Sequence, residues 1–321
     1  MQRGRFTASR EVCVISLLCA ACGGGDPPRI APARRDAAQQ LAIPLLGSLQ
    51  NPAWSPASHA ILFTRFAGGY NAGPADLFVV DLRDRDPRLL VSDGSDNVNL
   101  PGSSWNGVTG AIVFSSSRDP HDEIFSIDGG ARPGRETLVT KRTDFVAYEP
   151  TLSPDGRWAV FESHRIDQED GGVIMKAPVD GSSDSIPLTA GGDCRQPNWA
   201  PSGGRILYQT RTGSQWDIWV MNEDGTGARR VTSSPSDETD ASFSPDGASI
   251  VYSSNEGGLD LANLFVVPTA GGASTRVTDW DGYDGAPAWS PDGTRIIFES
   301  FAGDPDESAG TGLWIIDAPA P

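Results

Sequence analysis

Short hydrophobic runs separated by polar turns recur along this chain at nearly constant spacing. The clearest unit is the run 289–298, Trp-Ser-Pro-Asp-Gly-Thr-Arg-Ile-Ile-Phe. Its turn residues suit a tight reversal, because Pro presets φ, Asp can bond the local backbone and Gly accepts positive φ. An equivalent large hydrophobic residue opens six such units, at positions 54, 105, 152, 199, 243 and 289, with spacings of 51, 47, 47, 44 and 46 residues. A strand-rich repeat of this length predicts propeller blades.

Each unit contains the same succession of β-forming runs. One run follows the turn, as at 296–298, a third strand is expected at positions such as 218–221, and a fourth at positions such as 230–232. These runs are rich in branched and aromatic residues, and no helical period interrupts them between residues 50 and 317. The pattern predicts an all-β fold, a six-bladed β-propeller with four antiparallel strands per blade.

The last unit lacks a fourth run after Ile316, so the ring needs a strand from elsewhere. Residues 41–46, Leu-Ala-Ile-Pro-Leu-Leu, are expected to supply this closing strand from the N-terminal side. Closure would remove open sheet edges. Four of the six opening residues are Trp, and we expect them to pack between neighbouring blades as scaffold: Trp54, Trp105, Trp199 and Trp289.

The N-terminus differs from the rest of the chain. Three Arg precede an apolar run, 12–21, that is too short to span a membrane and is typical of an export signal. Ala20-Ala21 precede Cys22, and a Gly-rich stretch follows it. We therefore expect a signal peptide at 1–21, a flexible tether at 22–40 and the propeller at 41–317.

The Ala-Ala-Cys-Gly-Gly-Gly segment resembles a bacterial lipoprotein signal, which implies lipidation of Cys22 and a membrane anchor in the cell envelope. Cys19 stands where that family usually has Leu, and ordinary cleavage near Ala21 is the alternative. Gly23, in place of the Asp that holds such proteins at the inner membrane, favours the outer one.

The remaining cysteine and the charge constrain partners. Only Cys194 would remain for the folded domain, where a small buried residue is favoured over a nucleophile. Loss of residues 1–21 lowers the basic count from 25 to 22 and the acidic count from 42 to 41, so the net charge becomes −19. Such a surface excludes nucleic acid as a partner and permits cationic ones.

With the repeats in register, the units resemble the TolB-type propeller repeat. The fullest match is 215–225, Gln-Trp-Asp-Ile-Trp-Val-Met-Asn-Glu-Asp-Gly, followed by 229–232, Arg-Arg-Val-Thr. The resemblance covers about residues 41–317 and implies a six-bladed propeller in the bacterial envelope. It concerns the propeller part alone, since we expect no counterpart of the N-terminal α/β domain of TolB.

Catalytic motifs are not evident. Three histidines, His59, His121 and His164, are few for acid–base or metal chemistry, and no metalloprotease, P-loop or nucleophile-elbow motif occurs. Segments 279–285 and 237–240 are rich in Asp and invite a calcium interpretation, but they lack the EF-hand spacing and suit tight turns. We expect no catalytic residue, no metal ligand and no cofactor, with calcium a weak alternative.

Propeller geometry places the loops before each inner strand at one mouth of the central channel. We expect these loops to form an acidic rim with exposed aromatic side chains, suited to a protein or peptide partner. The candidate partner-binding residues are Asn51, Tyr148, Glu149, Arg195, Gln196, Asp240, Trp280, Tyr283 and Asp284, with Phe145 and Glu238 nearby.

Two candidate functions, a binding protein and an enzyme, are compatible with these features. The first is a monomeric, non-catalytic envelope lipoprotein that binds a protein or peptide at the acidic mouth. The alternative is an envelope enzyme, a hydrolase or lyase acting on a sugar or lactone with the channel as its active site. The scarcity of His favours the first.

Overall fold

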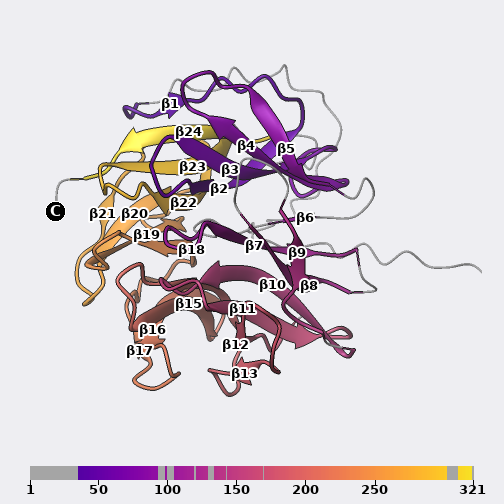
Figure 1. The fold of residues 1–321 in the computed structure, drawn as a ribbon. Coiled ribbons are helices and arrows are strands. Elements are labelled where there is room, and N and C mark those ends of the chain that lie inside the picture. Colours follow the sequence, from indigo (N-terminus) through magenta and orange to yellow (C-terminus); the bar gives the residue numbers. More distant parts are fainter. Residues whose placement is uncertain are drawn as a thin grey trace, which may run out of the picture.

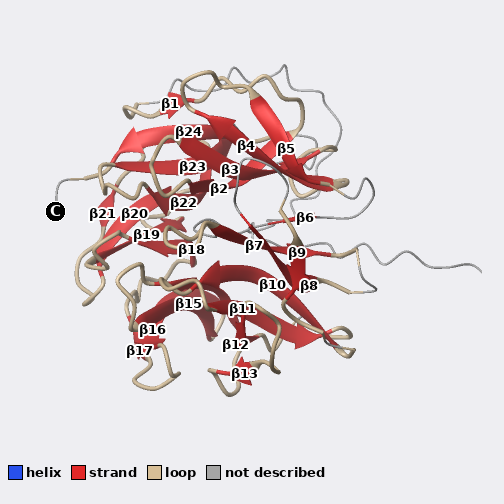
Figure 2. Cartoon of the chain, in the orientation of Figure 1, coloured by secondary structure: helices blue, strands red, loops and turns tan. Residues whose placement is uncertain are grey.

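The computed structural model describes residues 35–92, 98–99, 105–118, 121–128, 134–141, 143–168, 170–301 and 310–319. Within these ranges the secondary structure is entirely β, as Figure 2 shows. No helix in them is long and apolar enough to cross a membrane. The strands form six four-stranded sheets arranged around a centre (Figure 1). The predicted six-bladed propeller is confirmed.

Each blade is a meander in which neighbouring strands pair antiparallel, with the inner strand first. The first three blades contain β2 (Ser48–Trp54), β3 (Ala60–Phe66), β4 (Ala75–Asp81) and β5 (Pro87–Val91); β6 (Val98–Asn99), β7 (Ala111–Ser116), β8 (Glu123–Asp128) and β9 (Glu136–Leu138); β10 (Phe145–Leu152), β11 (Trp158–Arg165), β12 (Val173–Pro178) and β13 (Ile186–Pro187).

The second half of the ring repeats the order. Its strands are β14 (Cys194–Trp199), β15 (Arg205–Thr212), β16 (Gln215–Asn222) and β17 (Arg229–Arg230); β18 (Glu238–Phe243), β19 (Ser249–Ser254), β20 (Asn263–Pro268) and β21 (Thr275–Arg276); β22 (Tyr283–Trp289), β23 (Arg295–Phe301), β24 (Gly312–Asp317) and β1 (Gln39–Gln40).

The closing strand is β1, so its predicted position at 41–46 was wrong. Gln39 and Gln40 pair with Ile315 and Trp314, and the Leu41 N–H continues the pairing to the Leu313 carbonyl oxygen at 2.8 Å. Residues 41–46 instead pack apolar side chains at every second position, Leu41, Ile43 and Leu45, against the core between blades 1 and 6. An N-terminal strand closes the ring, two residues earlier than expected.

Hydrophobic cores lie at the junctions of neighbouring blades, where the opening Trp residues pack as predicted. Trp54 is 5% exposed and donates its indole N–H to the Ala288 carbonyl oxygen of blade 6 at 3.1 Å. Trp199 packs with residues of blades 3 and 4, and Trp289 with residues of blades 5 and 6. These contacts fix the blades around the channel and so position the site.

Candidate functional site

One residue in each of five inner strands has a left-handed backbone. The residue three positions before the opening hydrophobic residue has φ between 44° and 53° in five blades: Asn51, Glu149, Gln196, Asp240 and Ala286. A register shift occurs there in each of these inner strands. The matching position of blade 2 is Gly102, which lies outside the described residues. A bulge re-aims the side chain at its own position, so the repeat directs one residue from each of these five blades toward the centre.

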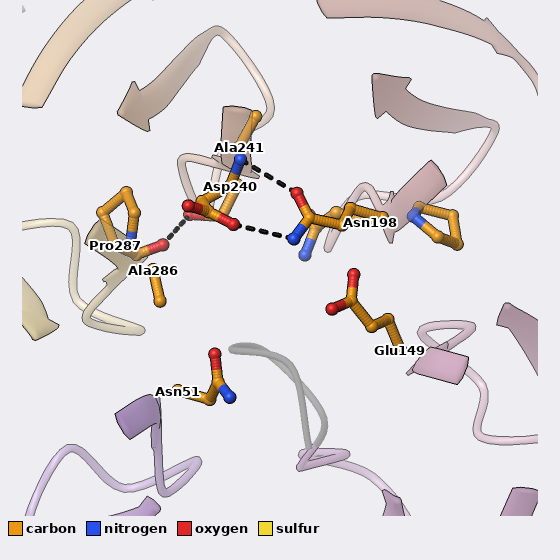
Figure 3. A pocket seen from close by; sticks show the side chains of 10 residues that line it. Asn51, Glu149, Asn198, Asp240, Ala241, Ala286 and Pro287 are labelled. Atoms are coloured by element: carbon orange, nitrogen blue, oxygen red, sulfur yellow. Dashed lines mark hydrogen bonds between the residues drawn. The ribbon is translucent and has the colours of Figure 1, made fainter. Parts of the chain in front are cut away.

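These five residues line a cavity of ≈ 40 Å³ at the centre of the ring. Glu149, Asp240 and Asn51 lie around one space in Figure 3, and Gln196 completes the polar lining, with carboxylates from blades 3 and 5 and amides from blades 1 and 4. A cavity of this size has room for a few water molecules or for the end of one side chain. Four of the nine predicted partner-binding residues therefore meet at one cavity.

A second layer of polar side chains holds the left-handed residues in place. Glu299 of β23 accepts the Asn51 N–H at 2.8 Å, and Glu162 of β11 accepts the Gln196 N–H at 2.9 Å. Both carboxylates are buried, 2% and 6% exposed. Each belongs to the blade that precedes its partner around the ring, so these bonds join neighbouring blades and add negative charge behind the cavity.

Sequence reasoning missed this second layer, although a signal exists. The position ten residues after each opening residue is polar and directly follows an aromatic one, and all six of its side chains are buried: Thr64, Ser115, Glu162, Gln209, Ser253 and Glu299. Buried polar groups are hydrogen-bonded. A polar residue that recurs at the same position of a hydrophobic strand therefore indicates a hydrogen-bond partner in the fold.

Gln196 and Asp240 form a reciprocal pair across the junction of blades 4 and 5. Gln196 Nε2 donates to Asp240 Oδ1 at 2.7 Å, and the Asp240 N–H donates to Gln196 Oε1 at 3.1 Å and to Gln209 Oε1 at 3.3 Å. Both bonds between Gln196 and Asp240 fix the orientation of the amide and of the carboxylate. This part of the cavity wall is therefore preorganised.

A tyrosine from the loop between β3 and β4 reaches blade 6 beside the cavity. The Tyr70 hydroxyl donates to Glu299 Oε1 at 3.3 Å and shares a second hydrogen bond with the Tyr283 hydroxyl, also at 3.3 Å, and its ring meets Phe301 edge-on. Burial, with the charge of Glu299 as the next cause, raises the pKa of Tyr70 well above its ordinary value. Tyr70 thus stays a neutral donor. It was not among the predicted residues, because a loop's reach is not encoded in the repeat.

Arg195 and Tyr148 lie on the rim next to cavity residues. Arg195 makes a two-point contact with Asp193, at 3.0 and 3.2 Å, and its guanidinium lies over the Trp216 ring. Its pKa is raised because Asp193 and the more distant Glu162 and Glu149 outweigh burial. Tyr148 is half-buried and its ring lies 5.6 Å from that of His164. Both side chains are partly exposed.

Four predicted rim residues are buried, so the expectation of exposed side chains was wrong for them: Glu149, which lines the cavity at 8% exposure, and three residues of blade 6 and the loop before it. Trp280 is 6%, Tyr283 7% and Asp284 0% exposed. The Trp280 indole N–H donates to Asp284 Oδ1 at 3.1 Å, and Tyr283 stacks on Phe301. Loop position alone suggested exposure, but these side chains pack into blade 6 and support the wall.

The remaining candidate residues from the sequence are Cys194, the two Asp-rich segments and Cys22. Cys194 is buried, and burial raises the pKa of its thiol, as fits a small core residue. Across the described ranges, which include both Asp-rich segments, no three His, Cys, Asp or Glu side chains group as a ligand set. Residues 1–34, which include the predicted signal and Cys22, lie outside the described residues.

Comparison with known proteins is consistent with this geometry. A family described as the TolB beta propeller domain matches residues 188–304. A TolB homolog of Chlorobium luteolum is 31% identical over 143 residues, which are 44% of this chain and 30% of the homolog. The propeller is TolB-like. A Tol-Pal system protein TolB of Anaeromyxobacter dehalogenans is 30% identical over 109 residues, 34% of this chain and 23% of that protein. The chain thus spans less than a third of the length of these two relatives.

Solved structures extend the likeness to the whole ring. TolB from Acinetobacter baumannii superposes with a TM-score of 0.59 at 16% identity, covering 85% of this chain and 64% of that one. An oligogalacturonate lyase in complex with manganese gives a TM-score of 0.58, also at 16% identity, covering 90% and 95%. At this identity the likeness concerns the fold, which a binding protein and a lyase share. The function of this TolB-like propeller must therefore be inferred from its site and not from its fold.

Proposed function

We propose that this TolB-like propeller is a non-catalytic cell-envelope lipoprotein that binds a protein or peptide partner at the acidic mouth of its central channel. The observation that carries the proposal is the central cavity, lined by Glu149 and Asp240 with Asn51 and Gln196 from four different blades. The relatives that match in sequence include TolB proteins, four of which are described as Tol-Pal system proteins, together with an uncharacterized peptidase and an isopeptidase. A lipid on Cys22 would hold the propeller at the membrane, the outer one in our proposal.

The chemistry of the wall favours a partner with a basic group. Glu149 and Asp240 line the cavity, and Glu162 and Glu299 lie behind the ring, so four carboxylates surround the centre. Charges of one sign at a funnel focus potential and speed the approach of an oppositely charged partner. Arg195, the cation beside them, is held by Asp193. A cationic segment of a protein partner is therefore the ligand we propose.

The lining of the cavity favours this function over the enzyme alternative. A hydrolase or lyase would need an acid–base pair facing its substrate. Of the two carboxylates that line the cavity, Asp240 is fixed by Gln196. We propose that both carboxylates serve recognition.

Site-directed photocrosslinking in envelope extract tests the proposal. A photoreactive amino acid replaces Tyr148 at the mouth in one variant and Arg157 in another. Arg157 is exposed in the turn between β10 and β11, at the other end of the same blade. We expect a discrete adduct from position 148 that disappears in Glu149→Gln/Asp240→Asn and none from position 157. An adduct from position 157 alone, or none from position 148, contradicts the proposal.

A further inference from the structure

Two carboxyl groups are buried together where blade 4 meets blade 5. Asp217 lies in β16, Glu238 begins β18, and each is 0% exposed. The side chain of Glu238 lies within hydrogen-bonding reach of Asp217. Two ionised carboxylates in such a place repel one another and lack solvation, which makes their joint ionisation unfavourable.

The hydrogen bonds around the pair leave one oxygen of each group unmatched. Arg230 Nη2 donates to Asp217 Oδ1 at 2.5 Å, and the Ser234 hydroxyl donates to Glu238 Oε1. Asp217 Oδ2 and Glu238 Oε2 are buried and receive no hydrogen bond from any residue in the described ranges. Two buried carboxyl groups within hydrogen-bonding reach of one another are satisfied together by one proton, which one group donates to the other.

Other junctions of the ring show that the fold does not require an acid pair. At the junction of blades 5 and 6 the corresponding positions are Asn263 and Asp284. Asn263 accepts from Arg276 at 2.8 Å and donates to two backbone carbonyls, so its amide is fully used. At the junction of blades 3 and 4 the positions hold Val173 and Cys194. Two facing acids are thus a particular property of the junction between blades 4 and 5.

This junction also carries the preorganised wall of the cavity. Glu238 stands two residues before Asp240 in β18, and Asp240 is held to blade 4 by Gln196 and Gln209. We propose that Asp217 and Glu238 bind one proton between them, and that this proton holds the start of β18 against blade 4 and so sets the position of Asp240 in the channel. The consequence for partner binding rests on the proposed function; the proton site does not.

The surroundings give the direction of the pH dependence. Burial, with Asp217 as a further cause, raises the pKa of Glu238 from 4.5 to about 7, against lowering by Ser234 and Thr232. The other titratable or charged groups packed around the pair are Arg230 on Asp217, Asp237 at the loop before β18, and Tyr252 on β19 with its neighbour Glu256. The raised pKa means that the folded junction holds the proton more tightly than an opened one. Its stabilisation is complete below pH 4.5 and is lost as the pH rises to about 7.

Hydrogen exchange of the free propeller tests the proposal without a partner. After correction for intrinsic rates, protection of segment 236–243 should fall by about tenfold per pH unit between about pH 4.5 and 7 and level off above, because one proton is released on opening. Segment 283–289 in blade 6 is the internal control. Glu238→Gln, which places an amide in the pair as Asn263 does in blade 5, should remove this dependence, and Asp217→Asn should shift it to lower pH, because burial alone still raises the pKa of Glu238. Either variant suffices if the other fails to fold.

A carbon-13 carboxyl titration gives the second readout. The Glu238 signal should titrate near pH 7, and its midpoint should fall in Asp217→Asn. A midpoint below pH 5, or a segment 236–243 whose protection ignores pH in the wild type, overturns the proton site. If the propeller with no other substitution gives no adduct from position 148 while both readouts are as expected, the proposed function is overturned and the proton site still stands.

Discussion

Replacing Trp54 by Phe should destabilise the ring more than the same change at Trp289. The two residues open blades 1 and 6 at equivalent positions and both pack between blades. Trp54 Nε1 donates to the Ala288 carbonyl oxygen at 3.1 Å, whereas the buried Trp289 Nε1 has no partner among the described residues. The comparison therefore reports mainly the indole hydrogen bond at the junction that closes the ring, because Phe keeps an aromatic face for the Arg295 guanidinium, which lies 4.8 Å from the Trp54 ring centroid.

The magnitude follows from the two environments. Both substitutions remove similar ring volume, and this loss cancels in the comparison. At Trp54 a hydrogen bond worth about 1 kcal/mol is lost, and the Ala288 carbonyl, in a residue 1% exposed, loses a buried donor at a cost of up to about 3 kcal/mol. At Trp289 the change removes an unpartnered N–H, which costs nothing. We expect Trp54→Phe to be less stable than Trp289→Phe by about 1–3 kcal/mol.

Equilibrium urea unfolding followed by circular dichroism measures the difference. The midpoints convert to free energies through the slope, which should be equal in the two variants because they bury similar surface. Trp54→Ala sets the scale, at about 3–5 kcal/mol for loss of the whole ring. Equal midpoints for the two Phe variants would refute the inference that the indole bond of Trp54 stabilises the closure.

Three further predictions concern closure, a turn and the anchor. Deleting 35–40 removes β1 and should lower the melting temperature by several degrees, whereas deleting 27–34 leaves every described contact in place and should not; equal melting curves would contradict closure by β1. Gly225→Ala should be strongly destabilising, because φ is +86° and a Cβ would lie 2.5 Å from a backbone oxygen of blade 3, while Gly213→Ala has open space and costs only backbone strain; urea midpoints decide between them. Intact mass spectrometry of the mature protein should show an acylated Cys22 as its first residue, and an unmodified N-terminus elsewhere would remove the anchor.

The six-bladed fold could be predicted from the sequence because each blade repeats one hydrophobic pattern. The predicted position of the closing strand was two residues too late because this fourth strand, Gln39–Gln40, is short and polar, as is Arg229–Arg230 in blade 4, and hydrophobicity does not mark such strands. Residues 41–46 were predicted as the closing strand because they are apolar. Their N–H groups instead bond two residues back, Ile43 to Leu41 and Leu45 to Ile43. Apolar content there reflects packing rather than pairing.

The site was predicted in part for a related reason. Position relative to the opening residue located Glu149, Gln196 and Asp240, because the bulge repeats in register. The same rule could not predict that Asp284 is buried. Its partner Trp280 lies in a loop whose length is not set by the repeat. Tyr70 escaped for that reason too.

The central claim is that the carboxylates at the mouth attract the partner. The direct measurement is the association rate of the partner captured through position 148, at low and high salt, with wild type and Glu149→Gln/Asp240→Asn. These amides keep the hydrogen-bonding capacity of Glu149, which is 8% exposed, and of Asp240, which is paired with Gln196. The control, Asp86→Asn/Asp184→Asn, neutralises two exposed carboxylates in loops at the opposite end of the blades.

We predict that neutralising the mouth slows association by on the order of tenfold at low salt and weakens its salt dependence, while the control pair matches wild type. An unchanged on-rate in the mouth variant, or an equal loss in the control, would contradict the claim that the channel mouth is the binding surface.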